Sequence, residues 1–443
     1  MGMSGKPGKK VLLIGNGARE HIMAEALVRS RHHVKLYVVG GAVNPGIKEL
    51  AEEYLVADVC DKDAIGEFAS RIRPDFAVVG PEAPIEAGIV DMLLELEIHS
   101  ASPLATVGRL ESSKSYTRDL LEKYQIPGNP AFKVFYNEDG LEDFFLELGD
   151  DYVVKADGLK GGKGVKVSGD HLNGISEGLE YARECLVESG RVVVEEKLIG
   201  QEFSLMSFCD GTFAVDMPVV QDHKRAYEGD SGPNTGGMGT YSDTDHGLPF
   251  LTLHDINEAS DMNKKVLKAL FEDTGVYYKG VMYGGFIATA KGVRLIEYNA
   301  RLGDPEAMNV LALLRSDFVD ICEGIINKTL DQVTVEFEKK ATVCKYVVPD
   351  GYPDKPLKGE KIEVGEIPEG VHAYYASVDK RDDGLYLSGS RAVAFVGVAD
   401  TIEEAERLAE SAVGSVKGPV FHRKDIGTKE LIDKKVEMMK GLR

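Results

Sequence analysis

The sequence predicts a multidomain protein of the α/β and α+β classes, and three observations support this prediction. Over the first hundred residues, apolar strands alternate with amphipathic helices, which is the pattern of a doubly wound parallel sheet. A β-hairpin pattern lies at residues 283–299, and a composition shift at 331–340 precedes a β-rich remainder. The chain of 443 residues is also too long for a single hydrophobic core, so several domains are expected.

The N-terminal elements alternate between strand and helix. Residues 10–15 form an apolar strand, and residues 19–30 carry apolar side chains at helical spacing. Further strands are expected at 34–40 and within 75–84, which ends in a loop. The ligand crevice of such a sheet lies at the carboxyl ends of its strands. We therefore expect the loops that follow these strands to face a ligand.

The middle of the chain predicts a small unit and a long loop. Residues 110–127 form a linker and a helix that Ser113 caps. Residues 152–199 follow the order strand, Gly-rich loop, helix, strand, and residues 202–220 alternate as paired antiparallel strands. The polar, Gly-rich stretch 221–240 is long for a connection within a compact domain, so we expect a functional loop there.

Composition and charge limit the class of function. The net charge of −21 argues against a nucleic-acid partner, whose phosphates need a basic face. Five scattered cysteines predict reduced core residues rather than disulfides or zinc ligands. No apolar run approaches the length of a membrane span, and the Gly- and Lys-rich residues 1–9 lack the apolar region of a signal peptide. We expect a cytoplasmic protein with a disordered N-terminal extension.

The hairpin pattern contains a candidate metal site. Two apolar runs flank Lys291-Gly292, which predicts a two-residue turn. Glu297 and Asn299 are two residues apart on the second strand, so both side chains leave the same face. A carboxylate and an amide oxygen are hard ligands suited to Mg²⁺ that bridges phosphates. The alternative is a strand whose polar residues face water.

A phosphate-binding pattern upstream weakens that alternative. KADGLKGGKG at residues 155–164 is a Gly-rich loop whose backbone amides can meet phosphate oxygens, although it is not a Walker P-loop. Lys155 alternates with apolar residues and points inward, and a buried lysine needs an anionic partner, which a triphosphate would supply. The alternative is a flexible surface loop. Metal ligands and phosphate donors together indicate ATP chemistry.

Two other patterns indicate anion binding. GNGAREH at residues 15–21 places two glycines at a strand-to-helix turn, where backbone amides can hold a phosphate. Glu20 replaces the third glycine of a dinucleotide fingerprint, so a dehydrogenase is disfavoured, while a phosphosugar site and tight packing both remain open. RLGDPE at residues 301–306 offers an arginine fork for a carboxylate or acyl phosphate. The alternative there is an ion pair between Arg301 and Asp304.

Two polar segments complete the set. QDHKR at residues 221–225 leads into GPNTGGMG at 232–239, and together they predict a loop that closes on a ligand. His223 stays unassigned, because a lone loop histidine is more often a hydrogen-bonding residue. EEKLIGQE at residues 195–202 follows a buried strand, where backbone groups can read an adenine edge and a carboxylate can accept from ribose hydroxyls.

Taken together, these segments resemble the phosphoribosylamine–glycine ligases of the ATP-grasp superfamily. The resemblance covers residues 11–427, and eight segments follow the family's order and spacing, which is highly specific. They are GNGAREH, VGPEAP, ESSK, KADGLKGGKG, QDHKR, GPNTGGMG, EYNARLGDPE and RKDIG.

The resemblance implies a domain arrangement and a reaction. The implied units are a disordered extension at 1–9, a Rossmann-like domain at 10–109, an ATP-grasp domain at 110–335 with a small lid at about 130–200, and a small β-rich C-terminal domain at 336–443. The implied reaction is the second step of purine (IMP) biosynthesis: ATP-dependent ligation of glycine to 5-phosphoribosylamine through glycyl phosphate. The products are glycinamide ribonucleotide, ADP and phosphate, and the implied metal is Mg²⁺ or Mn²⁺. Transient contact with the enzyme that makes phosphoribosylamine is an option that the sequence leaves open.

The resemblance also implies roles for individual residues. The implied catalytic residues are Lys155, Asp222 and Arg301, and the implied metal ligands are Glu297 and Asn299. The implied ATP-binding residues are Lys114, Lys155, Gly158, Gly161, Gly162, Lys163, Gly164, Val165, Glu195, Glu196, Leu198 and Glu202. The implied substrate-binding residues are Asn16, Gly17, Arg19, Pro81, Glu82, Pro84, Asp222, Lys224, Asn234, Thr235, Gly236, Gly237, Arg301 and Asp304.

Three departures from the family pattern concern affinity and lid dynamics rather than the reaction. Lys160-Gly161 replaces two alanines, Ala101-Ser102-Pro103 replaces a Gly-Pro ending, and Leu302 replaces phenylalanine. Two alternative functions stay open. One is another ATP-grasp enzyme, such as a purine-pathway carboxylase or a biotin carboxylase. The other is a nucleotide-binding regulatory protein without turnover, which the retained charged groups disfavour.

Overall fold

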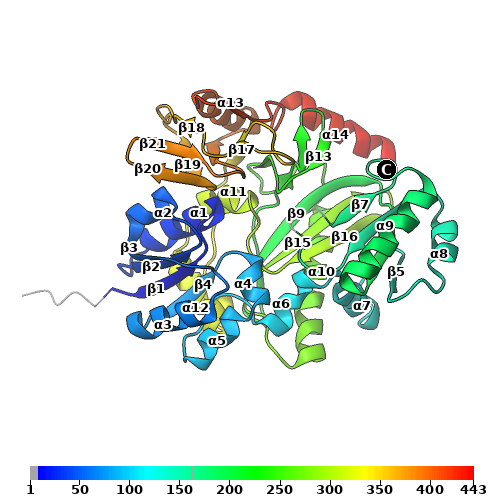
Figure 1. The fold of residues 1–443 in the computed structure, drawn as a ribbon, viewed down its shortest axis with the longest axis horizontal. Helices are drawn as coiled ribbons and strands as arrows, with labels where there is room; N and C mark the ends of the chain where they lie inside the picture. Colours follow the sequence, from blue (N-terminus) through cyan, green and yellow to red (C-terminus); the bar gives the residue numbers. More distant parts are fainter. Residues whose placement is uncertain (1–7, 161–163) are drawn as a thin grey trace, which may run out of the picture.

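The structure, a computed structural model, describes residues 8–160 and 164–443 (Figure 1). Most of the predicted N-terminal extension and three predicted ATP-binding residues, Gly161, Gly162 and Lys163, lie outside the described residues. The described chain mixes a parallel sheet with antiparallel sheets, so the predicted α/β and α+β fold class is confirmed. None of the helices in these ranges combines the length and apolar character that a membrane span requires.

The N-terminal unit is a parallel sheet with strand order β3-β2-β1-β4. Both faces of β1 are fully buried, because helices cover the sheet on both sides. The loops after β1 and β4 lie at the carboxyl ends of the strands, as expected. The elements are β1 (Lys10–Ile14), α1 (Ala18–Val28), β2 (Lys35–Gly40), α2 (Pro45–Leu50), β3 (Ala51–Val56), α3 (Lys62–Ile72), β4 (Phe76–Val79), α4 (Glu82–Glu86), α5 (Ile89–Glu95) and α6 (Ala105–Ser112).

A small four-stranded unit lies on the opposite side of the molecule, at the right of Figure 1. Its strand order is β5-β8-β6-β7, and its own core includes Phe145, Tyr152 and Val194. Ser113 caps the helix that precedes it by accepting a hydrogen bond from the backbone of Tyr116, as the sequence predicts. The elements are α7 (Lys114–Lys123), β5 (Phe132–Phe135), α8 (Leu141–Leu148), β6 (Tyr152–Ala156), β7 (Val165–Val167), α9 (Gly174–Ser189) and β8 (Val192–Glu196).

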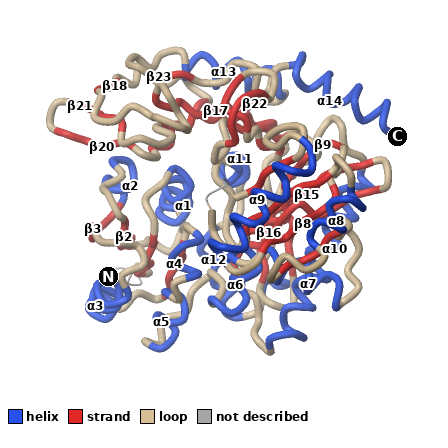
Figure 2. The backbone as a smooth tube through the Cα atoms, turned by 45° about the vertical axis from the view of Figure 1, so that its right-hand side comes forward, coloured by secondary structure: helices blue, strands red, loops and turns tan. Residues whose placement is uncertain are grey.

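The central sheet is antiparallel, with order β10-β9-β15-β16, and β9, β15 and β16 run side by side (Figure 2). The turn predicted at Lys291-Gly292 lies one residue earlier, because Gly292 already pairs with Thr289. A bulge leaves Ile296 without a partner in the ladder, since Gly285 pairs with Glu297 and Phe286 with Leu295. The elements are β9 (Gly200–Cys209), β10 (Ala214–Asp216), α10 (Leu253–Thr274), β15 (Gly280–Thr289), β16 (Gly292–Asn299), α11 (Glu306–Leu313) and α12 (Phe318–Asn327).

The C-terminal sheet includes strands from the polar loop at 221–240. Its order is β11-β14-β17-β22-β19, so β11 and β14 join strands that follow more than a hundred residues later. Two helices accompany the C-terminal strands: α13, and α14 at the end of the chain. The elements are β11 (Gln221–Asp222), β12 (Arg225–Tyr227), β13 (Ser231–Asn234), β14 (Gly239–Ser242), β17 (Ala341–Pro349), β18 (Lys361–Ile362), β19 (Val371–Tyr375), β20 (Val378–Arg381), β21 (Gly384–Leu387), β22 (Val393–Ala399), α13 (Ile402–Val413), β23 (Val420–Phe421) and α14 (Lys429–Leu442).

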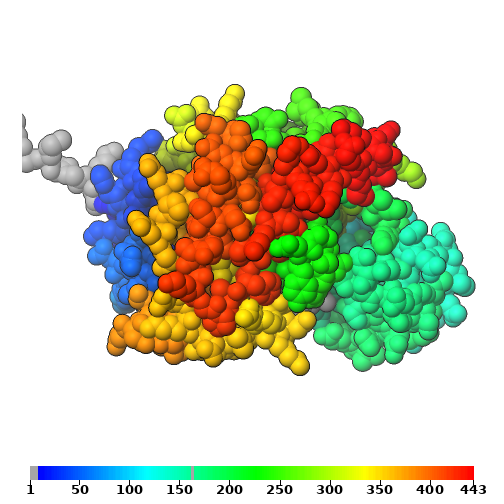
Figure 3. All heavy atoms as spheres, turned by 90° about the horizontal axis from the view of Figure 1, so that it is seen from above, coloured from blue at the N-terminus to red at the C-terminus, as the bar shows by residue number. Residues whose placement is uncertain are grey.

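The C-terminal segment packs directly against the N-terminal unit, and in Figure 3 it extends from the N-terminal side toward the small unit. His21 of α1 accepts a hydrogen bond at Nδ1 from the Tyr375 backbone N–H (3.0 Å), and its ring stacks on Tyr375. A Cβ on Gly46 would lie 1.9 Å from the His21 ring, so only glycine fits there. Burial lowers the pKa of His21 to about 4, which keeps the ring neutral at neutral pH.

This contact predicts a pH-dependent loss of stability. The pKa of His21 is about 4 in the folded chain against 6.5 ordinarily, so the unfolded chain binds more protons between these values. The contribution of neutral His21 to the free energy of unfolding is complete above pH 6.5. It falls as the pH drops toward 4, and the loss is about 2.5 kcal/mol near pH 4.5. Urea unfolding at several pH values measures this loss. His21→Gln should reduce the loss, whereas His254→Gln, at an exposed histidine, should not; equal slopes for both variants would contradict the assignment.

Candidate active site

A cavity of about 880 Å³ lies where the N-terminal unit, the small unit, the central sheet and the C-terminal segment meet. Most of the predicted site residues that the structure describes line it. Five of the described predicted residues are not among the lining residues, namely Asn16, Gly17, Pro84, Gly158 and Gly237. The predicted residues that line it are Arg19, Pro81, Glu82, Lys114, Lys155, Gly164, Val165, Glu195, Glu196, Leu198, Glu202, Asp222, Lys224, Asn234, Thr235, Gly236, Glu297, Asn299, Arg301 and Asp304.

The two candidate metal ligands lie at the end of β16. Glu297 and Asn299 both line the cavity, and Lys224 lies 3.6 Å from a Glu297 carboxylate oxygen. Burial raises the pKa of Glu297, but Lys224 and the lysines at 155 and 114 outweigh it and lower the pKa to about 2. Asn299 Oδ1 accepts a hydrogen bond from Arg301 (3.0 Å). An ionised carboxylate and an oriented amide oxygen therefore face the same space.

Lys155 has an anionic partner within the protein. Its ammonium lies 2.8 Å from Glu195 Oε2 and donates to the Ile296 carbonyl (2.7 Å). Arg118 of α7 holds both oxygens of the same carboxylate, at 2.6 and 3.0 Å. Burial holds the pKa of Lys155 below its usual value, although Glu195 opposes this effect. The expectation of a buried lysine was thus correct, and Glu195 meets its need for a negative partner.

The adjacent segments connect the small unit to the cavity. Lys114, at the start of α7, donates to the Gly158 carbonyl (2.9 Å), so it joins the helix to the Gly-rich loop. Gly158 has a φ of +94°, and a Cβ there would meet open space. Lys160, one of the departures from the family pattern, pairs with Glu188 of α9 at 2.5 Å. Glu196 accepts from the backbone N–H of Ala131 (2.8 Å).

Arg301 is held in place by carboxylates from two other elements. Its guanidinium lies 2.8 Å from Glu111 Oε1 and 3.3 Å from Glu82 Oε2. Burial lowers the pKa of Arg301, but these two carboxylates outweigh it and raise the pKa above its usual value. The alternative ion pair with Asp304 is not formed, since Asp304 pairs with Arg391 (3.1 Å).

The wall that faces the small unit carries two carboxylates, the half-buried Asp222 and the buried Glu306. Burial, and then the nearby Glu306, raise the pKa of Asp222 well above its usual value, while Lys224 opposes them. Glu306 accepts from the Tyr283 hydroxyl (2.6 Å). A Cβ on Gly237 would lie 2.8 Å from Asp222 Oδ1, so glycine allows the loop to pack on this carboxylate. Asp222 is therefore a carboxyl group of raised proton affinity at the wall of the cavity.

At the N-terminal turn, the Glu20 side chain packs closely against the backbone. The Gly17 N–H donates to Glu20 Oε2 (2.6 Å), so an amide at the helix start is already satisfied. Arg19 pairs with the other oxygen of Glu20 (2.6 Å) and lines the cavity. A Cβ on Gly80 would lie 2.1 Å from the Glu20 carboxylate, which explains why two strand ends carry glycine here. Tight packing around Glu20 is thus the observed arrangement.

His223, which the sequence left unassigned, is buried and lines the cavity beside Asp222. Its Nδ1 forms a hydrogen bond with the Gly239 carbonyl (3.2 Å), and within the described residues its Nε2 has no partner. Burial, with help from Lys435, lowers the pKa of His223 to about 3. The neutral ring is thus part of the support for β11.

Five lining residues were not predicted as site residues. Glu111 and Glu306 stand in the recognised segments ESSK and RLGDPE, but their roles depend on contacts with segments that are distant in sequence. The missed residues are Glu111, Arg118, Tyr283, Glu306 and Arg391.

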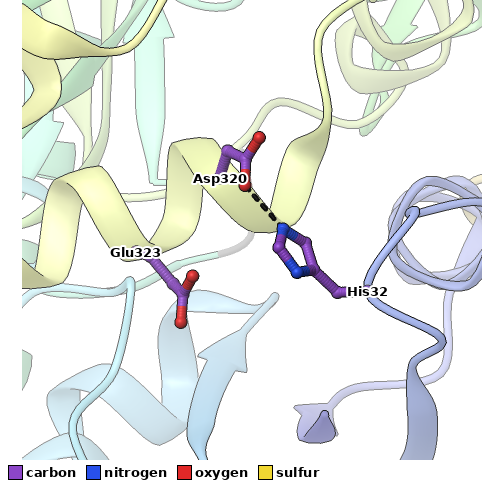
Figure 4. A group of neighbouring side chains, drawn as sticks. All are labelled: His32, Asp320 and Glu323. Atoms are coloured by element: carbon purple, nitrogen blue, oxygen red, sulfur yellow. Dashed lines mark hydrogen bonds and ion pairs between the residues drawn. The ribbon is translucent and has the colours of Figure 1, made fainter. Parts of the chain in front are cut away.

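Another group of potential metal ligands lies outside this cavity. Within residues 8–160 and 164–443, His32, Asp320 and Glu323 place ligand atoms within 4.8 Å of one another (Figure 4). His32 and Arg31 pair with Asp320, and Lys9 pairs with Glu323. Because cations already neutralise both carboxylates, this group attaches the N-terminal unit to α12.

Three family descriptions match consecutive parts of the chain. They are the N domain (residues 9–111), the ATP-grasp (A) domain (112–307) and the C domain (342–429) of phosphoribosylglycinamide synthetase. The chain belongs to the phosphoribosylamine–glycine ligase family. Members catalyse an ADP-forming ligation in purine biosynthesis, so this chain is an ATP-grasp ligase that uses ATP and a divalent metal ion.

Individual relatives in this ligase family cover nearly the whole chain. The phosphoribosylamine–glycine ligases of Methanocaldococcus jannaschii and Methanocella arvoryzae are 51% and 49% identical, and each match covers 98% of this chain and all of the relative. The crystal structure of the Thermotoga maritima ligase is 28% identical with a TM-score of 0.77, and covers 94% of this chain and all of that one. The biotin carboxylase domain of the Hydrogenobacter thermophilus 2-oxoglutarate carboxylase shares the fold alone, with a TM-score of 0.72 at 14% identity over 98% of this chain and 94% of that domain.

The buried ion pairs of the ligase site predict unequal effects on stability. Arg118→Met leaves Glu195 with one cation and should lower the free energy of unfolding by about 3–5 kcal/mol. Lys155→Met should cost only about 1–2 kcal/mol, because Arg118 still holds both carboxylate oxygens. Arg183→Met breaks an exposed pair in the same small unit and should change little. Urea unfolding measures all three, and an Arg118→Met effect no larger than that of Arg183→Met would refute the ranking.

Proposed function

We propose that one side of the cavity binds ATP and the other binds glycine and 5-phosphoribosylamine, which the enzyme ligates through glycyl phosphate. The observation that supports this division best is the arrangement of cations. Lys114 and Lys155 come from the small unit and its entry helix, whereas Lys224 and Arg301 come from the opposite wall. Glu297 and Asn299 lie between the two groups. Phosphoryl transfer needs this kind of charge neutralisation and positioning.

ATP would lie between the small unit and the central sheet. Its phosphates would meet Lys114, Lys155 and the backbone of the Gly-rich loop, from Gly158 to Val165. Its adenine would lie against the hinge formed by Glu196 and Leu198, and its ribose near Glu202, all of which line the cavity. Glu195 would act indirectly, because its carboxylate is fully engaged by Arg118 and Lys155.

The metal-binding residues would be Glu297 and Asn299, and Mg²⁺ or Mn²⁺ fits them. Glu297 is held ionised by the surrounding lysines, and Asn299 presents an oxygen whose orientation Arg301 fixes. Hard oxygen donors of this kind suit both ions. When bound, such an ion neutralises charge on the transferring phosphoryl group.

The remaining residues would act on the acceptor substrates. Arg301 would orient the glycine carboxylate whose oxygen attacks the γ-phosphorus as ADP leaves. The phosphoribosylamine nitrogen would then attack the carbonyl carbon, and the C–O bond to phosphate would break. Asp222, whose pKa is raised, would take the proton that the nitrogen loses. Arg19, Glu82 and the turn before α1 would lie on the phosphoribosylamine side.

The division into two sides predicts how turnover depends on substrates. Sustained ADP release should require both glycine and phosphoribosylamine, because glycine is needed to form the acyl phosphate and the amine is needed to consume it before another turnover can begin. A coupled assay with each substrate omitted in turn measures this requirement. Equal ADP release from ATP alone, or turnover that depends on bicarbonate instead of glycine, would overturn the proposal.

The metal assignment predicts opposite changes from two nearly isosteric substitutions. Glu297→Gln removes a full negative charge and should raise the Mg²⁺ concentration needed for half-maximal activity about tenfold or more. Asn299→Asp keeps an oxygen ligand and adds charge, so it should leave that concentration unchanged or lower it. Activity measured over a Mg²⁺ series tests both variants. If both only lower the thermal unfolding temperature, the two residues form a structural polar patch.

A further inference from the structure

Arg391, in the C-terminal segment between β21 and β22, reaches the acceptor wall of the cavity. Its Nη1 donates to the carbonyls of Gly236 (2.7 Å) and Gly237 (3.0 Å), which lie about 155 positions earlier in the chain. The same nitrogen donates to the Asp304 carbonyl (3.0 Å). One guanidinium thus joins the 234–237 loop to the segment that follows β16.

The guanidinium is itself held firmly by its neighbours. Its Nη2 lies 3.1 Å from Asp304 Oδ2, and its Cζ lies 4.4 Å from the centre of the Tyr346 ring. The Tyr346 hydroxyl donates to the other Asp304 oxygen (2.7 Å). Burial lowers the pKa of Arg391, but Asp304 outweighs it and raises the pKa, so the side chain is a permanent cation.

The loop is shaped to fit this arginine. A Cβ on Gly236 would lie 3.2 Å from Arg391 Cζ, so the loop backbone lies directly against the guanidinium. On its other side the loop is fixed by Thr235, whose hydroxyl donates to the Lys224 carbonyl (2.9 Å) and accepts from the Gly237 N–H (3.0 Å). Arg391 is therefore the anchor that joins this loop to the C-terminal segment.

We infer that Arg391 is a positioning residue for the amino-acid substrate, acting through the 234–237 loop and Asp304. This inference rests on the proposed function, in which these groups face glycine rather than ATP. A loop that loses this anchor presents its backbone in many arrangements, so binding of the small substrate weakens. The ATP side, formed by the small unit and β16, keeps its own supports.

Steady-state kinetics distinguish positioning from general support. Arg391→Gln should raise the KM for glycine about tenfold or more while the KM for ATP stays within about twofold. Arg391→Lys keeps the charge beside Asp304 but lacks the fork that spans several acceptors, so it should recover only part of the loss. Arg381→Gln is the matched control, because Arg381 makes the same two kinds of contact outside the cavity. Its Nε lies 2.9 Å from Asp379 Oδ2, and its Cζ lies 3.9 Å from the centre of the Tyr386 ring.

Hydrogen exchange tests the loop without relying on turnover. In the free protein, Arg391→Gln should speed exchange at residues 234–238 about threefold or more relative to wild type and Arg381→Gln. Unchanged exchange, or equal rises in both KM values, would overturn the inference while leaving the ligase function intact. Wild-type turnover that does not depend on glycine would instead overturn the proposed function, and the assignment of Arg391 to glycine with it.

Discussion

The buried carboxylate of Glu195 is the group on which the proposed ATP side of the cavity depends. A buried carboxylate is costly unless charged partners and hydrogen bonds surround it, and this one has both. Arg118 approaches from α7 and Lys155 from β6, while Glu195 itself lies near the end of β8. The entry helix and two strands of the small unit therefore meet at one ion cluster. Any movement of the small unit that separated Arg118, Lys155 and Glu195 would expose these charges to water or leave them buried without a partner.

The bulge in β16 belongs to the same arrangement. Because Ile296 has no partner in the ladder, its carbonyl is free to accept from both Arg118 (2.8 Å) and Lys155 (2.7 Å). The hydrogen bonds to this carbonyl thus offset part of the desolvation cost of burying the Arg118 and Lys155 side chains. It also places the residue after the bulge, Glu297, where the lysines lower its pKa to about 2. The ion cluster and the candidate metal ligand Glu297 therefore meet at one local distortion of β16.

The sequence located candidate site residues wherever a short segment contains the whole pattern. The strand-to-helix turns, the Gly-rich loop, and Glu297 with Asn299 could be located because their spacing alone sets the geometry. The roles of Glu20 and Arg118 could not, since each depends on a side chain packing against a segment far away. The hairpin turn was misplaced by one residue because Gly292, with a φ of +89°, begins the strand rather than ending the turn.

The proposed acceptor side of the cavity shows why the order of segments along the chain hides part of the site. The loop at 221–240 contributes β11 and β14, which are strands of the C-terminal sheet, although the loop stands before the last strands of the central sheet. The same loop supplies Asp222 and Lys224 to the cavity. The position of this loop is therefore determined by its pairing with β17, about a hundred residues later in the chain, and by contacts with side chains of the C-terminal sheet. A C-terminal domain in which RKDIG alone was recognised as a family segment can for this reason determine the shape of the proposed acceptor wall.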